Sequence, residues 1–283
     1  MNKKNKIKSN YNNNKVLVFI YLITVVLTII SMFKEIESKN IKNVIVCFLS
    51  LFLLSVPFIV DKFKKVKFPP VLKITFILFV FSTIVLGEVN DFYELIPIWD
   101  DILHIVQGFF IASIGFSLMY MLFKKKVESN DRDKNKNSDK NKKINKDRIR
   151  FEKGLIVLFS FCLSISVGVV WEVGEYITDC NMNVDMQKDK YINEFNSILL
   201  NPKKDNEVMV VDKIGYTTIY DEYGKRIVTF NGYLDVGLHD TMDDLIDTLV
   251  GSLLFGVIGY LYLSNRERYR FVEMFFIKEK MNK

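Results

Sequence analysis

Long apolar runs separated by short polar segments predict membrane-spanning helices. Six such runs occur, at residues 16–33, 41–60, 71–86, 102–123, 154–177 and 241–263. An α-helix of about 20 apolar residues crosses the ~30 Å hydrocarbon core of a bilayer. The first run follows a Lys-rich stretch, but it is too long for a signal peptide and lacks a small-residue cleavage site. We therefore expect an all-α, six-helix polytopic membrane protein with an uncleaved first helix.

Two longer polar segments interrupt this pattern. Residues 124–153 carry many Lys, Asp and Asn and few apolar side chains, which is typical of a disordered linker. Residues 180–238 form a second segment, in which 216–221 and 226–230 flank the turn sequence Glu-Tyr-Gly-Lys. We expect a small external insertion of β-hairpin or α/β type here. It is either a lid over the outer face or an inert extracellular addition.

The distribution of charge gives the expected orientation. The net charge is +6, and segments 1–15, 61–73, 124–153 and 264–283 hold 29 of the 39 Lys and Arg residues. Basic residues concentrate on the cytoplasmic side of membrane proteins, so both termini are expected in the cytoplasm of a plasma-membrane protein. This positive charge therefore gives no reason to expect a nucleic-acid partner. The basic, aromatic tail 264–283 is expected to contact anionic membrane lipids.

Composition agrees with this class. Hydrophobic residues make up 49% of the chain, with 24 Phe and a mean hydropathy of +0.15, and the three cysteines exclude a disulfide framework. Acidic residues lie within or next to the last three apolar runs, whereas the first three runs contain none. Together with His104, these acidic residues share helix faces as three stripes. The stripes are Asp100 and His104; Glu172, Glu175 and Asp179; and Asp240, Asp243, Asp244 and Asp247.

The acidic stripes all lie toward the same predicted side of the membrane. A charge at the centre of a membrane helix costs about 2.5–3.5 kcal/mol, so the carboxyl groups either hold protons or surround a cation. Oxygen ligands with one imidazole suit a divalent metal such as Mg, Mn, Fe or Zn. The predicted metal ligands are Asp100, His104, Glu175, Asp240 and Asp244, with Glu172 or Asp247 as the catalytic general base.

Structural roles compete with this interpretation. Asp100 or Asp101 could cap the fourth helix, and Asp240 with Asp243 resembles a capping arrangement for the sixth. His239 is expected to be a loop residue. The alternative for the candidates without a capping role is a buried polar network between helices; these are His104, Glu172, Glu175 and Asp244. The glycines of the last three runs are expected to permit close helix packing.

Three short motifs resemble those of the YjdF-type family of bacterial inner-membrane proteins. They are Asp-x-x-x-His at 100–104, Glu-x-x-Glu at 172–175, and Asp-Thr-x-x-Asp at 240–244 with Gly251 downstream. The resemblance covers roughly residues 75–260 and extends remotely to VanZ-like proteins. It implies a multi-pass envelope protein of unsettled activity. This chain departs from the pattern at Asp101 and in its long linker and insertion.

The expected function is metal-assisted chemistry on an envelope lipid or lipid-linked substrate, at a site open to the outer face. A cation- or proton-coupled transporter would use buried carboxylates as a relay. Transporter sites usually lie between repeated halves, and the first three helices share none of the motifs of the last three. A non-catalytic envelope sensor or assembly protein is the third alternative.

Overall fold

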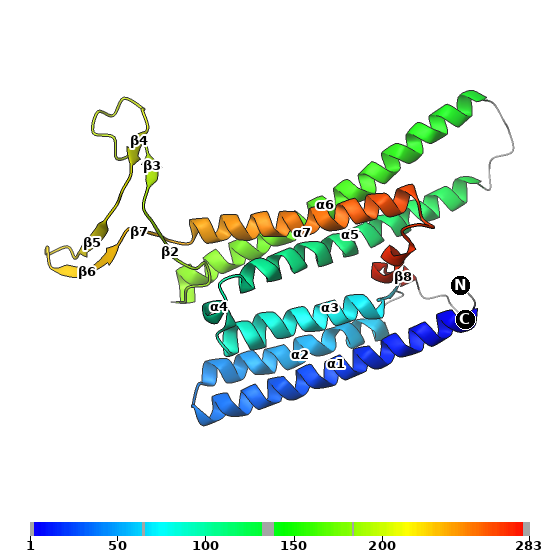
Figure 1. Ribbon diagram of the computed structural model, residues 1–283, viewed down its shortest axis with the longest axis horizontal. Coiled ribbons are helices and arrows are strands. Elements are labelled where there is room, and N and C mark those ends of the chain that lie inside the picture. The colour runs from blue at the N-terminus through cyan, green and yellow to red at the C-terminus, as the bar shows by residue number, and fades with distance from the viewer. Residues whose placement is uncertain (1–2, 64–65, 132–138, 183, 280–283) are drawn as a thin grey trace. The chain divides into compact units, whose positions relative to one another are not determined.

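Helices dominate the fold, and short strand pairs form the insertion (Figure 1). The computed structural model describes residues 3–63, 66–131, 139–182 and 184–279. Its helices are α1 (Lys3–Glu37), α2 (Ile41–Phe63), α3 (Pro70–Val80) continued by the π-helix η1 (Phe81–Val89), α4 (Phe92–Leu95), α5 (Trp99–Asp131), α6 (Asp139–Met182), α7 (Leu238–Ser264) and the 3-10 helix η2 (Arg270–Phe275). Within these described ranges, six helical segments are long and apolar enough to cross a membrane, which confirms the prediction from the apolar runs.

The chain forms two compact units. Unit 1 comprises Met1–Gly168 with Leu245–Lys283, and unit 2 comprises Val169–Asp244. Unit 1 therefore holds most of the apolar helical structure. Unit 2 holds the last turns of α6, the insertion and the first turns of α7, and with them many of the acidic residues singled out above.

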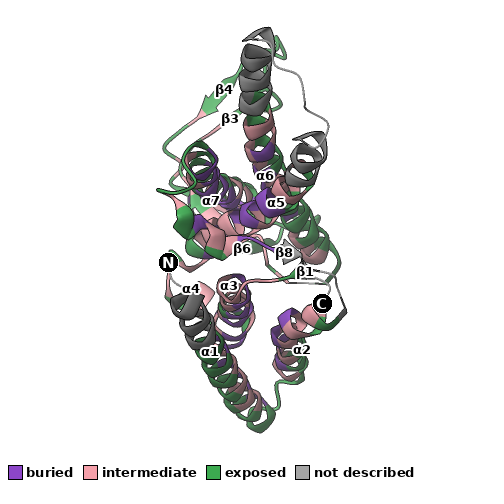
Figure 2. Ribbon diagram, turned by 90° about the vertical axis from the view of Figure 1, so that its right-hand side faces the viewer, coloured by how far each residue is buried: buried purple, intermediate pink, exposed green. Residues whose placement is uncertain are grey.

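Within unit 1, α1, α2 and α3 lie side by side around one apolar cluster (Figure 1). Leu54 and Ile77 are fully buried at its centre. The opposite faces of α1 and α2 expose large apolar side chains such as Phe19 and Phe52 (Figure 2). Exposed apolar faces of this extent are expected where lipid is the solvent.

A second apolar cluster in unit 1 joins α5, α6, α7 and the C-terminal tail. Val272 and Phe276 of the tail are buried and share this cluster with Phe116 and Phe255. The end of the tail, β8 (Lys278–Glu279), pairs antiparallel with β1 (Val66–Lys67). The tail thus folds back onto the helices instead of continuing α7 into the membrane interface. Phe276 stacks on the ring of Phe116, whereas Phe271 is exposed.

Glycines allow the backbones of α5 and α7 to approach closely. A Cβ atom at Gly251 would collide with the carbonyl of Ile105, and one at Gly108 with the carbonyl of Thr248. Helix α6 joins the same packing, because Ser164 Oγ donates a hydrogen bond of 2.8 Å to the carbonyl of Gly108. Small residues and interhelical hydrogen bonds are the usual means of helix association in membranes. The expected role of these glycines is confirmed at Gly108 and Gly251.

Helices α5 and α6 extend into the segment where a linker was expected. Helix α5 continues to Asp131, and α6 begins at Asp139. The Lys and Glu residues in these extensions are good helix formers, which favours continuation of each helix. Residues 132–138, at the centre of the predicted disordered segment, lie outside the described residues.

The insertion between α6 and α7 is built from three antiparallel strand pairs. These are β2 (Lys190–Ile192) with β7 (Tyr233–Asp235), β3 (Phe195–Ser197) with β4 (Met209–Val211), and β5 (Tyr216–Tyr220) with β6 (Arg226–Asn231). The last pair is the predicted hairpin. Its turn is closed by the Asp221 amide, which donates to the Lys225 carbonyl, and Gly224 adopts φ +78° there.

Candidate functional site

Three carboxylates converge in unit 2, where α6 ends and α7 begins. Glu172, Glu175 and Asp244 each offer an oxygen, and these oxygens lie within 4.8 Å of one another. Glu172 is 4% exposed and Asp244 is 2% exposed, whereas Glu175 is half-buried. We call these three residues the carboxylate group. Three carboxylate oxygens this close together could hold one cation.

Helical spacing explains how the chain brings these oxygens together. Glu172 and Glu175 are three residues apart on α6 and therefore share one face of the helix. The indole Nε1–H of Trp171 donates a 2.9 Å hydrogen bond to Glu175 Oε1, which holds that carboxylate in place. Asp244 approaches from α7. Glu172, predicted as a general base, thus lies among the predicted metal ligands.

Electrostatics makes the carboxylate group costly without a positive partner. Two unit charges 4.8 Å apart repel by about 3–4 kcal/mol at an effective dielectric constant of 20. Burial of Glu172 and Asp244 adds the cost of removing charge from water. A divalent ion would offset both the repulsion between the carboxylates and the cost of burying their charge. A shared proton would offset part of the repulsion.

A short segment of the insertion ties α6 to α7 beside the carboxylate group. Asp179, near the end of α6, accepts hydrogen bonds of 2.7 and 2.8 Å from the amides of Met186 and Gln187. The Gln187 amide group donates to Thr241 Oγ1, and the Lys188 amide donates to Asp240 Oδ2. We call residues 186–190 the strap. Asp179 and Asp240 therefore accept hydrogen bonds from the backbone of the strap in this structure.

Lys190 brings a cation to this acidic end of α7. Its ammonium lies 2.8 Å from Asp243 Oδ2 and 3.7 Å from Asp240 Oδ1. Partial burial lowers the pKa of Lys190, but the hydrogen bond to Asp243 and the negative charges of Asp243, Asp240 and Asp244 raise it above 10.5 overall. Sequence reasoning missed this residue, because it is 50 or more positions from its partners in α7 and follows no helical pattern.

Lys190→Met is expected to loosen the strap. An exposed ion pair contributes about 0.2–1 kcal/mol, so local opening should increase by up to about fivefold. Limited proteolysis of the insertion in the detergent-purified protein measures this opening, with Lys225→Met on the hairpin turn as the control. The raised pKa means that the contribution is complete below pH 10.5 and is lost as the pH rises through the folded-state value. Equal cleavage of both variants at neutral pH would contradict the expectation.

Asp235, at the end of the insertion, caps the start of α7. Asp235 Oδ2 accepts 2.7 Å and 2.9 Å hydrogen bonds from the backbone amide and ring Nδ1 of His239. Burial alone would raise the pKa of Asp235, but these bonds to His239 and the charges of His239 and Lys190 lower it overall. His239 is exposed and paired with Asp235, but it lies in the first turn of α7 and not, as was expected, in a loop.

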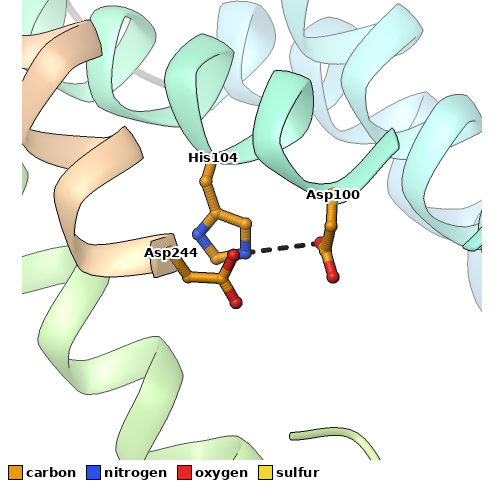
Figure 3. A group of neighbouring side chains, drawn as sticks. All are labelled: Asp100, His104 and Asp244. Atoms are coloured by element: carbon orange, nitrogen blue, oxygen red, sulfur yellow. Dashed lines mark ion pairs between the residues drawn. The ribbon is translucent and has the colours of Figure 1, made fainter. Parts of the chain in front are cut away.

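In unit 1, Asp100 and His104 form a pair on the first turns of α5 (Figure 3). His104 Nε2 lies 3.6 Å from Asp100 Oδ1, as their four-residue spacing predicts. His104 is buried and Asp100 is half-buried. A carboxylate beside an imidazole nitrogen can orient the ring or bind a metal together with it. Asp101 and Asp247, on α5 and α7 of the same unit, are also half-buried.

Comparison with known proteins identifies the family. A family model described as "Predicted membrane protein (DUF2238)" matches residues 16–265. The chain belongs to this family. A curated relative from Thermotoga maritima, printed as "Uncharacterized protein", is 27% identical over 123 residues, which are 44% of this chain and 52% of the relative. The chain thus spans about half the length of that relative. No solved structure matches this chain.

Membership of the DUF2238 family agrees with the resemblance to YjdF-type proteins and with a membrane location. The matched region includes five of the six candidate spans found among the described residues in full, and all but the first two residues of the span in α1. It also contains the carboxylate group, the Asp100–His104 pair and the strap. The family description names no activity, so function has to be argued from the side chains themselves.

Proposed function

We propose that this DUF2238 protein binds a divalent metal ion through Glu172, Glu175 and Asp244. The observation that carries the proposal is the convergence of these three carboxylates within 4.8 Å, two of them buried, in an apolar helical protein. Hard divalent cations such as Mg²⁺ and Mn²⁺ prefer oxygen ligands of this kind.

We further propose that Asp100 and His104 of α5 bind a metal ion as a pair within unit 1. The support is the 3.6 Å separation of Asp100 Oδ1 from His104 Nε2, because a carboxylate beside an imidazole nitrogen is a common arrangement at metal sites. Asp240, also among the ligands predicted from sequence, would instead hold the strap and Lys190.

The proposed reaction is metal-assisted chemistry on an envelope lipid or lipid-linked headgroup. A divalent ion polarises a phosphoryl or carbonyl oxygen, or activates a water molecule. Asp247, one turn from Asp243 on α7, would act as general base. The positive-inside count supports an outward-facing site in the plasma membrane, where lipid headgroups approach the ends of α6 and α7.

Metal content and turnover test the proposal together. The full chain is purified in mild detergent, stripped with EDTA and titrated with Mn²⁺, which reports oxygen ligation through its electron paramagnetic resonance spectrum. One tightly bound ion per chain is expected. Incubation of the loaded protein with total membrane lipid should release a headgroup that mass spectrometry detects and that EDTA suppresses. Absence of bound ion, together with proton-driven solute uptake in vesicles, would contradict the proposal and favour a transporter.

A further inference from the structure

The loop between β3 and β4 turns aliphatic side chains outward. Ile198, Leu199 and Leu200 follow one another at its start, and Leu199 is 93% exposed. The two neighbours are about half exposed, and Val208 is exposed at the other end of the loop. Other apolar side chains of the insertion, such as Val210 and Ile227, are also exposed, but residues 198–200 are three consecutive aliphatic residues in one loop.

Polar groups in the same loop are satisfied internally, so the loop has a defined conformation. The side-chain amide of Asn201 donates to Asp205 Oδ1 and to the Glu207 carbonyl, and its Oδ1 accepts from the Lys203 amide. Asp205 Oδ1 also accepts from the Glu207 amide. The loop therefore orders its polar groups around Asn201 and Asp205 while it presents its aliphatic residues to the surroundings.

We propose that residues 198–200 insert into the surface of the phospholipid bilayer that α6 and α7 cross. The insertion is attached at both ends to membrane-spanning helices. Lys203 and Lys204 are exposed beside the aliphatic residues, and neither forms an ion pair with another described residue. An apolar tip next to free ammonium groups matches the acyl region and the phosphates of a lipid leaflet.

The size of the patch favours lipid over a second protein. Three aliphatic side chains offer roughly 100 Å² each, whereas a stable protein interface buries about 800 Å² per partner. Insertion into lipid needs no complementary surface, and its strength follows the apolar area and the charge of nearby basic residues. The proposal is independent of the metal site.

Site-directed spin labelling of the full chain in lipid nanodiscs tests this loop. Cys162 and Cys180 are replaced by Ser, Cys47 is buried, and a nitroxide is attached after Leu199→Cys or, as the control, Tyr223→Cys. Tyr223 is 87% exposed on the turn of the β5–β6 hairpin. Collisions of the label with oxygen, which dissolves in lipid, are compared with collisions with a water-soluble nickel chelate.

At position 199, oxygen collisions are expected to exceed nickel collisions, and at position 223 the order should reverse. Addition of phosphatidylglycerol to phosphatidylcholine nanodiscs should deepen the label at 199, and Lys203→Glu with Lys204→Glu should abolish that dependence. Equal nickel access at both positions would overturn the proposal. Spin–spin broadening at 199 that disappears on dilution with unlabelled chain would overturn it in favour of a second copy.

Discussion

Asp244→Asn is expected to weaken binding of Mn²⁺ by at least about 100-fold, because loss of even a group that supports a ligand costs about 10–100-fold. The weaker binding should also reduce the free energy by which Mn²⁺ stabilises the folded protein. At an ion concentration 100 times the dissociation constant, the wild type gains about 2.7 kcal/mol, whereas the variant would gain only about 0.4 kcal/mol. Thermal unfolding in detergent, with and without Mn²⁺, measures both values.

The stability of the metal-free Asp244→Asn variant distinguishes a cation site from a structural hydrogen-bonded network. Removal of one of three mutually repelling carboxylates should leave the metal-free variant at least as stable as the wild type. A hydrogen-bonded network would instead lose about 1–3 kcal/mol whether or not the ion is present. Asp243→Asn is the matched control, because Asp243 is the adjacent residue, is exposed and faces Lys190. Equal losses of Mn²⁺ affinity in the two variants would refute the assignment of Asp244.

Gly251→Val is expected to destabilise the protein by at least about 3 kcal/mol, at the upper end of the cost of overpacking. The new side chain would meet the carbonyl of Ile105 and the amide nitrogen of Phe109, which are backbone atoms and cannot rotate away. Helices α5 and α7 would have to separate. Thermal unfolding of the metal-free protein in detergent measures the loss.

Gly174→Ala provides the control for helix propensity. It lies on the membrane-spanning part of α6, and no atom lies within 4 Å of the Cβ that alanine would add. Replacement of a mid-helix glycine by alanine should therefore stabilise the protein by about 0.5–1 kcal/mol. A loss in Gly174→Ala as large as that in Gly251→Val would show that backbone contact between α5 and α7 is not the cause.

Local pattern was enough to predict the spans, the hairpin and the residues of the candidate site. Each span is a run of apolar residues whose length matches the bilayer, and the β5–β6 hairpin follows from turn residues between two β-prone stretches. The pairing of Asp100 with His104, and the shared face of Glu172 and Glu175, follow from three- and four-residue helical spacing. All of these features depend only on neighbours in the chain.

Contacts between distant residues could not be predicted in this way. Gln187 of the strap donates a hydrogen bond to Thr241, which is 54 residues away. Lys190 lies in a strand, so helical spacing could not predict its ion pair with Asp243 of α7. From sequence, Asp179 therefore belonged only to an acidic stripe and Asp240 was a predicted metal ligand, whereas in the structure both accept hydrogen bonds from backbone amides of the strap. The burial of Val272 and Phe276 likewise required α7 to end and the tail to turn back.

The sequence by itself determined that this protein is a six-helix membrane protein with an acidic set of helix ends, because hydrophobicity and helical period are local properties. The tertiary structure decided which acids converge and which hold the chain in place. That choice depends on where α6, α7 and the insertion approach each other, and such approaches are set by packing of side chains far apart in sequence.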